Sequence, residues 1–147
     1  MKDRNLTPDD NWATPKWFYD LLDSEFKFDF DPCPYFEGEI TKENDGLLIE
    51  WGRSNFVNPP YSRLLKQSFV VKALHELSKG KKSVLLLPVS TSTVLFHEWI
   101  KPSAKEIRFI QGRIKFQKKD PESGEFYTPK NGGMHDSMLV IFDNTIY

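Results

Sequence analysis

Six residues in the middle of the chain are Phe56-Val57-Asn58-Pro59-Pro60-Tyr61. Phe56 and Val57 are typical of the end of a buried strand. The prolines lack an N–H, hold their own φ at about −65° and keep the residue before each of them extended. We therefore expect the carbonyls of Asn58 and Pro59 to stay out of helical hydrogen bonding. Together with the Asn58 amide and the ring of Tyr61, they would form a stiff cup at the strand end.

Such a cup suits a planar group that carries an NH₂. The amide oxygen of Asn58 and the carbonyl of Pro59 can each accept one N–H, while Tyr61 stacks on the plane of the group. Accepting both hydrogens makes the nitrogen lone pair more available for attack. An ordinary Pro-Pro turn is the alternative, but this sequence directly after a buried strand favours a catalytic site. Its residues would be Asn58, Pro59, Pro60 and Tyr61.

This segment resembles the catalytic motif of S-adenosylmethionine-dependent amino methyltransferases, and the chain is similar, more narrowly, to phage-type DNA N6-adenine methyltransferases. The segments that carry the resemblance are Trp12-Ala13-Thr14-Pro15, Phe28-Asp29-Phe30-Asp31, Asp45-Gly46-Leu47, Trp51, Asn58 to Tyr61, Leu85-Leu86-Leu87-Pro88, Gly112-Arg113-Ile114-Lys115-Phe116 and Met138 to Phe142. The resemblance implies an α/β protein with a shortened Rossmann-like methyltransferase fold. It would have a mostly parallel sheet, an antiparallel last strand and helices on both faces. The implied activity is methyl transfer from S-adenosylmethionine to the N6 amine of a flipped-out adenine in DNA.

Length and composition indicate one soluble globular domain, because the chain has 147 residues, of which 39% are hydrophobic and 28% charged. We assign the domain to residues 11–147 and a polar, flexible arm to residues 1–10. No apolar run could span a bilayer and no secretory signal opens the chain, so we expect a cytoplasmic protein, in the host cytoplasm if phage-encoded. The single Cys33 excludes an internal disulfide, and the scattered histidines predict no metal site.

Charge is unevenly distributed, although the formal net charge is only −1. Residues 1–50 contain 13 Asp and Glu against 5 Lys and Arg, whereas residues 51–147 contain 15 Lys and Arg against 8 Asp and Glu. An acidic first part suits a cationic ligand such as a sulfonium, and a basic second part suits phosphates. The alternative is that both parts are solvated surfaces.

Residues near the start of the chain are candidates for binding the cofactor. Thr14 is a good helix N-cap, Pro15 is favoured at the first helical position, and the apolar spacing predicts a helix from Pro15 to about Ser24. The resemblance implies that Trp12, Thr14 and Pro15 lie beside the methionine end of the cofactor. A plain helix cap is the alternative.

Alternating apolar and acidic residues predict a half-buried strand over Phe26 to Asp31. Carboxylates at the end of such a strand lie where ligands bind in open α/β sheets. A glycine-rich loop is absent here and Pro32-Cys33-Pro34 takes its place, so the cofactor would depend on Asp29 or Asp31, which the pattern does not separate. Cys33 could suggest the nucleophile of cytosine C5 methylation, but no activating base is near it, which favours a structural thiol.

Asn44-Asp45-Gly46-Leu47 resembles a motif that contacts the adenine of the cofactor. Asp45 would accept a hydrogen bond from the adenine amine, and Asn58 would also border the cofactor. A simple Asp-Gly turn is the alternative.

The rest of the chain predicts alternating helices and strands, with a loop at Pro121 to Gly133. The expected helices cover residues 63–79 and 93–100, and the expected strands residues 83–88, 105–110 and 137–142. Basic and apolar residues alternate from Gly112 to Phe116, which suits a DNA backbone and an unstacked base, or else a strand with a charged outer face. The candidate DNA-binding residues are Arg63, Arg113, Lys115, Lys118 and Lys119.

Two other functions remain open. The same cup could hold a glutamine amide of a protein or an exocyclic amine of RNA. A non-enzymatic DNA-binding module without cofactor is also open, because the glycine-rich loop is missing.

Overall fold

The structure is a computed structural model that describes residues 10–145. Of the predicted arm over residues 1–10, all but Asp10 lies outside the described residues. The elements, in chain order, are α1 (Lys16–Phe26), β1 (Ser54–Val57), α2 (Arg63–Ser78), β2 (Lys82–Pro88), η2 (Leu95–Ile100), β3 (Glu106–Phe109), β4 (Lys118–Lys119), β5 (Phe126–Tyr127) and β6 (Ser137–Phe142). The helix expected over residues 63–79 and the strands expected over residues 83–88, 105–110 and 137–142 are confirmed to within one residue at each end.

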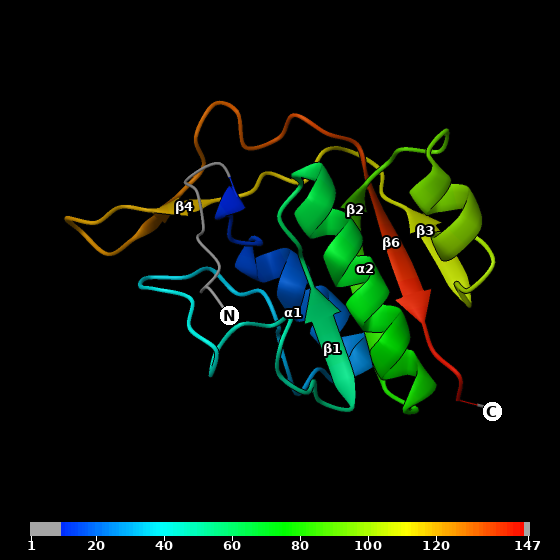
Figure 1. Ribbon diagram of the computed structural model, residues 1–147. Coiled ribbons are helices and arrows are strands. Elements are labelled where there is room, and N and C mark those ends of the chain that lie inside the picture. The colour runs from blue at the N-terminus through cyan, green and yellow to red at the C-terminus, as the bar shows by residue number, and fades with distance from the viewer. Residues whose placement is uncertain (1–9, 146–147) are drawn as a thin grey trace.

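The main sheet has the strand order β1-β2-β6-β3 (Figure 1). β1 and β2 run parallel, whereas β6 runs antiparallel to both β2 and β3. The predicted antiparallel last strand is therefore confirmed. The sheet is mixed rather than mostly parallel, because β6 inserts between β2 and β3. Among the named strands of residues 10–145, only β1 and β2 form a parallel pair.

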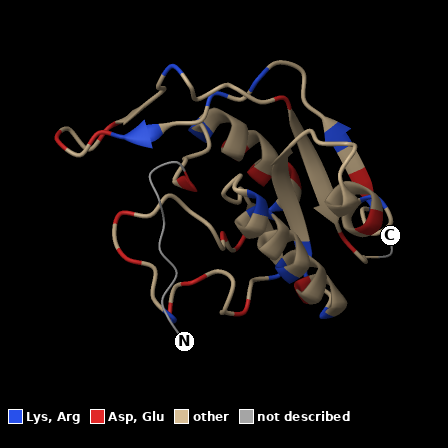
Figure 2. Ribbon diagram, turned by 45° about the horizontal axis from the view of Figure 1, so that its top comes forward, with Lys and Arg blue, Asp and Glu red and all other residues tan. Residues whose placement is uncertain are grey.

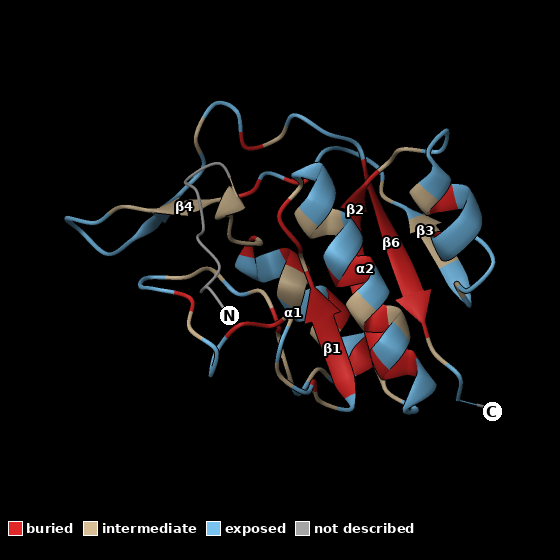
Figure 3. Ribbon diagram, viewed as in Figure 1, coloured by how far each residue is buried: buried red, intermediate tan, exposed pale blue. Residues whose placement is uncertain are grey.

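Helices cover both faces of the sheet, as predicted, because apolar side chains of the central strands alternate between two cores. Leu85 and Leu87 of β2 pack with α2 and η2, while Val84 and Leu86 pack with α1. β6 alternates in the same way, and Figure 3 shows β1, β2 and β6 buried along their length. Burying one such side chain stabilises the fold by about 1.5–3 kcal/mol. No helix of the described residues is long and apolar enough to cross a membrane.

The strand predicted over Phe26 to Asp31 is wrong. Helix α1 continues to Phe26 and ends at Lys27, which adopts the left-handed conformation with φ 54°. Beyond it, only Phe30 makes a single parallel bridge, to Asn55. The alternating phenylalanines instead belong to an aromatic cluster, because Phe28 stacks on Phe26 with ring centroids 5.9 Å apart. An alternating pattern can therefore arise from ring packing without a strand ladder.

The segment predicted as a loop over Pro121 to Gly133 contains half of a small hairpin. β5 pairs antiparallel with β4, and the hairpin projects from the body of the molecule (Figure 1). The preceding alternation is not a strand either: Ile114 and Phe116 are buried in the core, while Arg113 and Lys115 are exposed.

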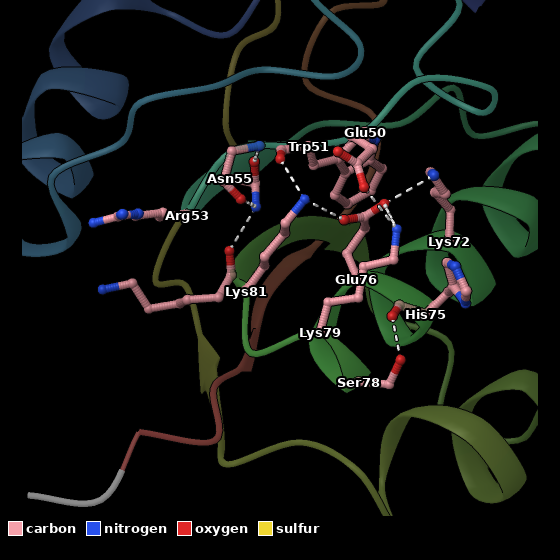
Figure 4. A network of polar contacts seen from close by, with 12 residues as sticks. Glu50, Trp51, Arg53, Asn55, Lys72, His75, Glu76, Ser78, Lys79 and Lys81 are labelled. Atoms are coloured by element: carbon pink, nitrogen blue, oxygen red, sulfur yellow. Dashed lines mark hydrogen bonds and ion pairs between the residues drawn. The ribbon is translucent and has the colours of Figure 1, made fainter.

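A charged network anchors the C-terminal end of α2 to the start of the sheet (Figure 4). The carboxylate of Glu76 is fully buried and lies 2.9 Å from Lys72 Nζ and 3.0 Å from Lys81 Nζ. Lys81 also donates to the carbonyl of Trp51, 2.8 Å away. Burial by itself raises the pKa of Glu76, but the hydrogen bonds and charges of Lys72 and Lys81 outweigh it and lower the pKa to about 2.

Replacing Glu76 by Gln should lower the free energy of unfolding by about 2 kcal/mol at pH 7, as expected when hydrogen bonds to a buried charge are lost. The folded-state pKa is depressed, so the contribution of Glu76 is present above its unfolded pKa of 4.5 and is lost as the pH falls towards about 2. Urea denaturation should therefore show the difference between wild type and Glu76→Gln shrinking below pH 4.5.

Glu50→Gln is the matched control, because Glu50 pairs with Lys79 of the same network but its side chain is 77% exposed. This change should alter stability by less than about 0.5 kcal/mol. Equal losses in the two variants would contradict the role given to the buried carboxylate.

Candidate functional site

The segment from Asn58 to Tyr61 lies directly beyond the carboxyl end of β1, as predicted. Val57, the last residue of β1, is fully buried, Asn58 is half-buried, and the next helical residue is Arg63. Within residues 10–145 the carbonyl of Pro59 accepts no hydrogen bond. The prolines thus leave an unused acceptor at the strand end, because the chain can neither extend the strand nor begin a helix there.

The side chain of Asn58 is held from one side. Its Nδ2 donates to Oγ1 of Thr14 at 3.0 Å, a contact between residues far apart in sequence. Within the described residues, Oδ1 of Asn58 accepts no hydrogen bond. The predicted helix cap by Thr14 is wrong: the N-cap of α1 is Pro15, without a side-chain cap, so Pro15 also precedes the first helical residue.

Two cavities meet at Asn58. Cavity A has a volume of about 220 Å³ and cavity B about 170 Å³, and both are bordered by Trp12 and Asn58. The other residues of cavity A are Asp10, Pro59, Tyr61, Phe116, Asn131, Gly132, Met134 and His135. The other residues of cavity B are Ala13, Thr14, Tyr19, Asp31, Cys33, Pro34, Tyr35 and Phe56. A group bound in A and a group bound in B could therefore both contact Asn58.

Tyr61 forms a wall of cavity A rather than a free rim. Its ring packs edge-to-face against Phe116, with centroids 5.9 Å apart, and against His135 at 5.7 Å. Burial raises the pKa of Tyr61 above its ordinary value, so the phenol stays neutral. The ring is thus held in place beside Asn58, as stacking on a flat ligand requires.

The loop over residues 131–135 closes cavity A from the side of the hairpin. Phe116 N–H donates to the carbonyl of Gly132 at 2.9 Å. A Cβ at Gly132 would lie 2.4 Å from the carbonyl oxygen of Phe116, so only glycine permits this approach. Sequence reasoning missed Asn131, Met134 and His135 as cavity residues, because nothing in a Gly-rich loop indicates which side chains turn inward.

The structure gives Asp29 and Asp31 different roles, which the sequence pattern could not distinguish. Asp29 accepts hydrogen bonds from the backbone N–H groups of Ser54 (3.0 Å) and Arg53 (3.3 Å), and so fixes the turn before β1. Asp31 borders cavity B and accepts from the N–H of Cys33 at 3.0 Å. Burial raises the pKa of Asp31 to about 7, although the N–H of Cys33 acts in the opposite direction.

Asp45 lies in a turn and is not among the residues that border cavities A and B. Its carboxylate accepts from the N–H of Leu47 at 2.9 Å, and its side chain is buried. The turn packs closely on Pro32, since a Cβ at Gly46 would lie 1.9 Å from the Pro32 carbonyl oxygen. The predicted contact of Asp45 with an adenine amine stays a prediction.

The candidate DNA-binding residues differ in their exposure and in their contacts with the rest of the protein. Arg63 and Lys115 are exposed. Lys118, by contrast, donates to the carbonyl of Asn11 and lies over the ring of Trp12, and Lys119 pairs with Glu37. Figure 2 shows Lys and Arg on β4 and on the loops at the same edge of the molecule.

Arg113 borders a third cavity, cavity C, on the far side of Tyr61. Cavity C has a volume of about 370 Å³, and Tyr61 and His135 border both A and C. Its basic side chains are Arg113, which pairs with Asp136 at 3.1 Å, and Lys66 of α2. Lys66 was not predicted, since on sequence alone it is one of several lysines on the outer side of a helix. No group of three or more His, Cys, Asp or Glu in residues 10–145 could hold a metal ion.

Sequence comparisons agree with the chemistry of this site. The chain matches the family model described as DNA N-6-adenine-methyltransferase (Dam) over residues 4–146. It is also 36% identical over 144 residues to the DNA N-6-adenine-methyltransferase of Haemophilus phage HP1 (strain HP1c1), covering 91% of this chain and 79% of that protein. The family match contains the Asn58–Tyr61 segment and the residues of the surrounding cavities. The chain therefore belongs to the DNA N-6-adenine-methyltransferase (Dam) family and is an adenine-specific DNA methyltransferase.

Proposed function

We propose that this enzyme uses S-adenosylmethionine to methylate the N6 amine of an adenine flipped out of DNA, within a shortened Rossmann-like methyltransferase fold. One observation carries the proposal: cavities A and B meet at Asn58, so an amine and a methyl donor can approach each other there. Cavity A would take the adenine and cavity B the donor.

The residues of cavity B suit the donor by their chemistry. The carboxylate of Asp31 complements a cation, and the rings of Trp12, Tyr19 and Tyr35 provide flat apolar surface. We propose that Asp31, Trp12 and Pro15 hold the donor, and that Thr14 and Asn58 border it without contributing much to its affinity. When bound, S-adenosylmethionine supplies an electrophilic methyl group on a sulfonium. Asp29 is left out, because its carboxylate holds the backbone before β1.

In cavity A the protein's own groups position the amine. Oδ1 of Asn58 and the carbonyl of Pro59 accept the two N6 hydrogens, while Tyr61 packs against the base. As the amine attacks, the bond between the methyl carbon and the sulfonium sulfur would break to leave a neutral thioether, and the amine nitrogen becomes positive. The two oxygens stabilise that charge until one N6 hydrogen leaves as a proton to water. Positioning and electrostatics therefore provide the catalysis, without a covalent bond to the protein. Flipping the adenine out of the duplex costs a few kcal/mol, which contacts to the flanking DNA must offset.

Cavity C lies where such contacts would be made. Because it shares Tyr61, Met134 and His135 with cavity A, phosphates beside the flipped nucleotide would meet Lys66 and Arg113. Arg113 would exchange its exposed ion pair with Asp136 for a phosphate, at little cost. Arg63 and Lys115 would add further phosphate contacts, and the hairpin of β4 and β5, with Lys118 and Lys119, is the proposed source of sequence preference.

Asn58→Ala should reduce methylation of DNA by at least about a hundredfold, because it removes an acceptor that acts on the developing charge. Binding of S-adenosylmethionine, measured by calorimetry, should stay within about threefold of wild type. Methylation is measured with labelled cofactor and plasmid DNA, and mass spectrometry identifies the modified base as N6-methyladenine.

Asn144→Ala is the matched control, since Asn144 is exposed and its side chain donates to the carbonyl of Leu77 near the end of α2. It should retain full activity. Near-normal methylation by Asn58→Ala, with folding intact, would overturn the assigned mechanism.

Binding of S-adenosylmethionine should tighten as the pH rises through about 7, the pKa of Asp31. Below this pH the half-buried carboxyl is neutral and cannot pair with a cation, so affinity at pH 6 should be about tenfold weaker than at pH 8. Calorimetry on Asp31→Asn in the same buffers separates this effect from the titration of the ligand's own amino group. The variant should bind more weakly and lose most of the pH dependence. An unchanged profile would show that Asp31 does not face the cation.

Lys66→Ala and Arg113→Ala should each weaken DNA binding and reduce the slope of log K against log salt concentration by about one, as loss of one phosphate contact does. Fluorescence anisotropy over a salt series measures both quantities. Lys101→Ala provides the control, because Lys101 is exposed and lies outside cavity C. If all three variants behave alike, cavity C does not bind the backbone.

A further inference from the structure

The proposed mechanism depends on which way the amide of Asn58 points. A half-turn about the last torsion of the side chain exchanges its oxygen for its NH₂ group. In one orientation Asn58 accepts a hydrogen from the substrate amine. In the other orientation the NH₂ group of Asn58 faces the NH₂ group of the substrate. Neither group then accepts a hydrogen bond, and the amine is repelled. Catalysis therefore requires the first orientation, and a contact that anchors the amide would hold it there once the substrate amine is bound.

The structure contains one such contact. Nδ2 of Asn58 donates to Oγ1 of Thr14 at 3.0 Å, and Asn58 Oδ1 accepts no hydrogen bond from residues 10–145. The NH₂ group is thus engaged on the side of cavity B, while the oxygen remains available. If the amide turned round, the hydroxyl of Thr14 could still donate to the oxygen, but the NH₂ group would then meet the hydrogens of the substrate. With substrate bound, both ends of the amide favour the same orientation.

Thr14 is itself fixed by the backbone on both sides. Ala13 and Gln117 exchange two hydrogen bonds, of 2.8 and 2.9 Å. On the other side, the carbonyl of Pro15 accepts from the N–H groups of Phe18 and Tyr19, each at 3.1 Å. The hydroxyl of Thr14 does not cap α1, the role that a Thr before a helix usually has. An anchored hydroxyl without a capping role is well suited to holding a neighbouring side chain.

We infer that Thr14 is a positioning residue, which holds the amide of Asn58 with its oxygen towards the N6 amine. This inference rests on the proposed function. It differs from the expectation that Thr14 binds the carboxylate of the cofactor, although Thr14 also borders cavity B. The two roles affect different kinetic constants and can be separated by experiment.

Thr14→Val keeps the shape of the side chain and removes the hydroxyl. At saturating cofactor and DNA, kcat should fall about tenfold, the order of one lost hydrogen bond. The dissociation constant of S-adenosylmethionine and the KM for DNA should stay within about twofold. Thr14→Ser, which restores the hydroxyl, should recover kcat to within about twofold of wild type. Thermal unfolding of both variants checks that the fold is retained.

Measuring Thr14→Val in an Asn58→Asp background adds a second test. A purely structural role of Thr14 would give the same loss of kcat in both backgrounds. A carboxylate has two equivalent oxygens, so its orientation no longer matters, and adding Thr14→Val should cost much less than in wild type. The comparison of Thr14→Val with Thr14→Ser decides the role of Thr14 whatever the activity of Asn58→Asp.

Two results would overturn the inference: an unchanged kcat in Thr14→Val, or a weaker cofactor affinity with unchanged kcat at saturation, which would make Thr14 a cofactor ligand. Failure of the proposed function looks different, because wild type itself would then form no N6-methyladenine.

Discussion

The parallel pairing of β1 with β2 determines where the candidate site of this enzyme lies. Parallel strands end at the same edge of a sheet, so Asn58 after β1 and Val89 after β2 emerge at the same edge. Pro59 and Pro60 stop the backbone from extending the strand or starting α2 at that edge. The space left open there becomes cavities A, B and C, which are joined through Asn58 and Tyr61.

Two asparagines, Asn55 within β1 and Asn58 just beyond it, differ in how far their side chains are used by the fold. The side chain of Asn55 is buried and fully used, because it accepts from Gly52 N–H and donates to the carbonyls of Gly52 and Lys82. Asn58, three residues later, uses only its NH₂ group within the described residues. The buried network around Glu76 secures the opposite edge of the sheet (Figure 4). The ion pairs of Glu76 thus stabilise one end of the strands, while the amide oxygen of Asn58 at the other end remains an available acceptor.

The sequence predicted the second half of the fold better than the first. Apolar runs such as residues 83–88 and 137–142 have no favourable alternative to a buried strand, and both form one. Residues 26–31 alternate apolar and polar residues as a half-buried strand does, yet they follow helix α1 and the ring of Phe28 packs against Phe56. Period-two patterns record which side chains are buried, and they do not record whether a neighbouring strand is present to pair with. The position of β6 inside the sheet was equally beyond local patterns, since it depends on pairing across the whole chain.

In the candidate site, too, some features could be predicted from the sequence and others were decided only by the tertiary structure. Asn58, Pro59 and Tyr61 could be named from the sequence because proline geometry and side-chain chemistry are local properties, and the resemblance to a family rests on the same residues. Only the folded chain decided that Asp31 and not Asp29 faces a cavity, that Thr14 contacts Asn58, and that Lys66, Asn131 and His135 border the space around Tyr61. These facts depend on how loops distant in sequence pack against the end of one strand. Such long-range packing sums many weak contacts, which no short segment of sequence encodes.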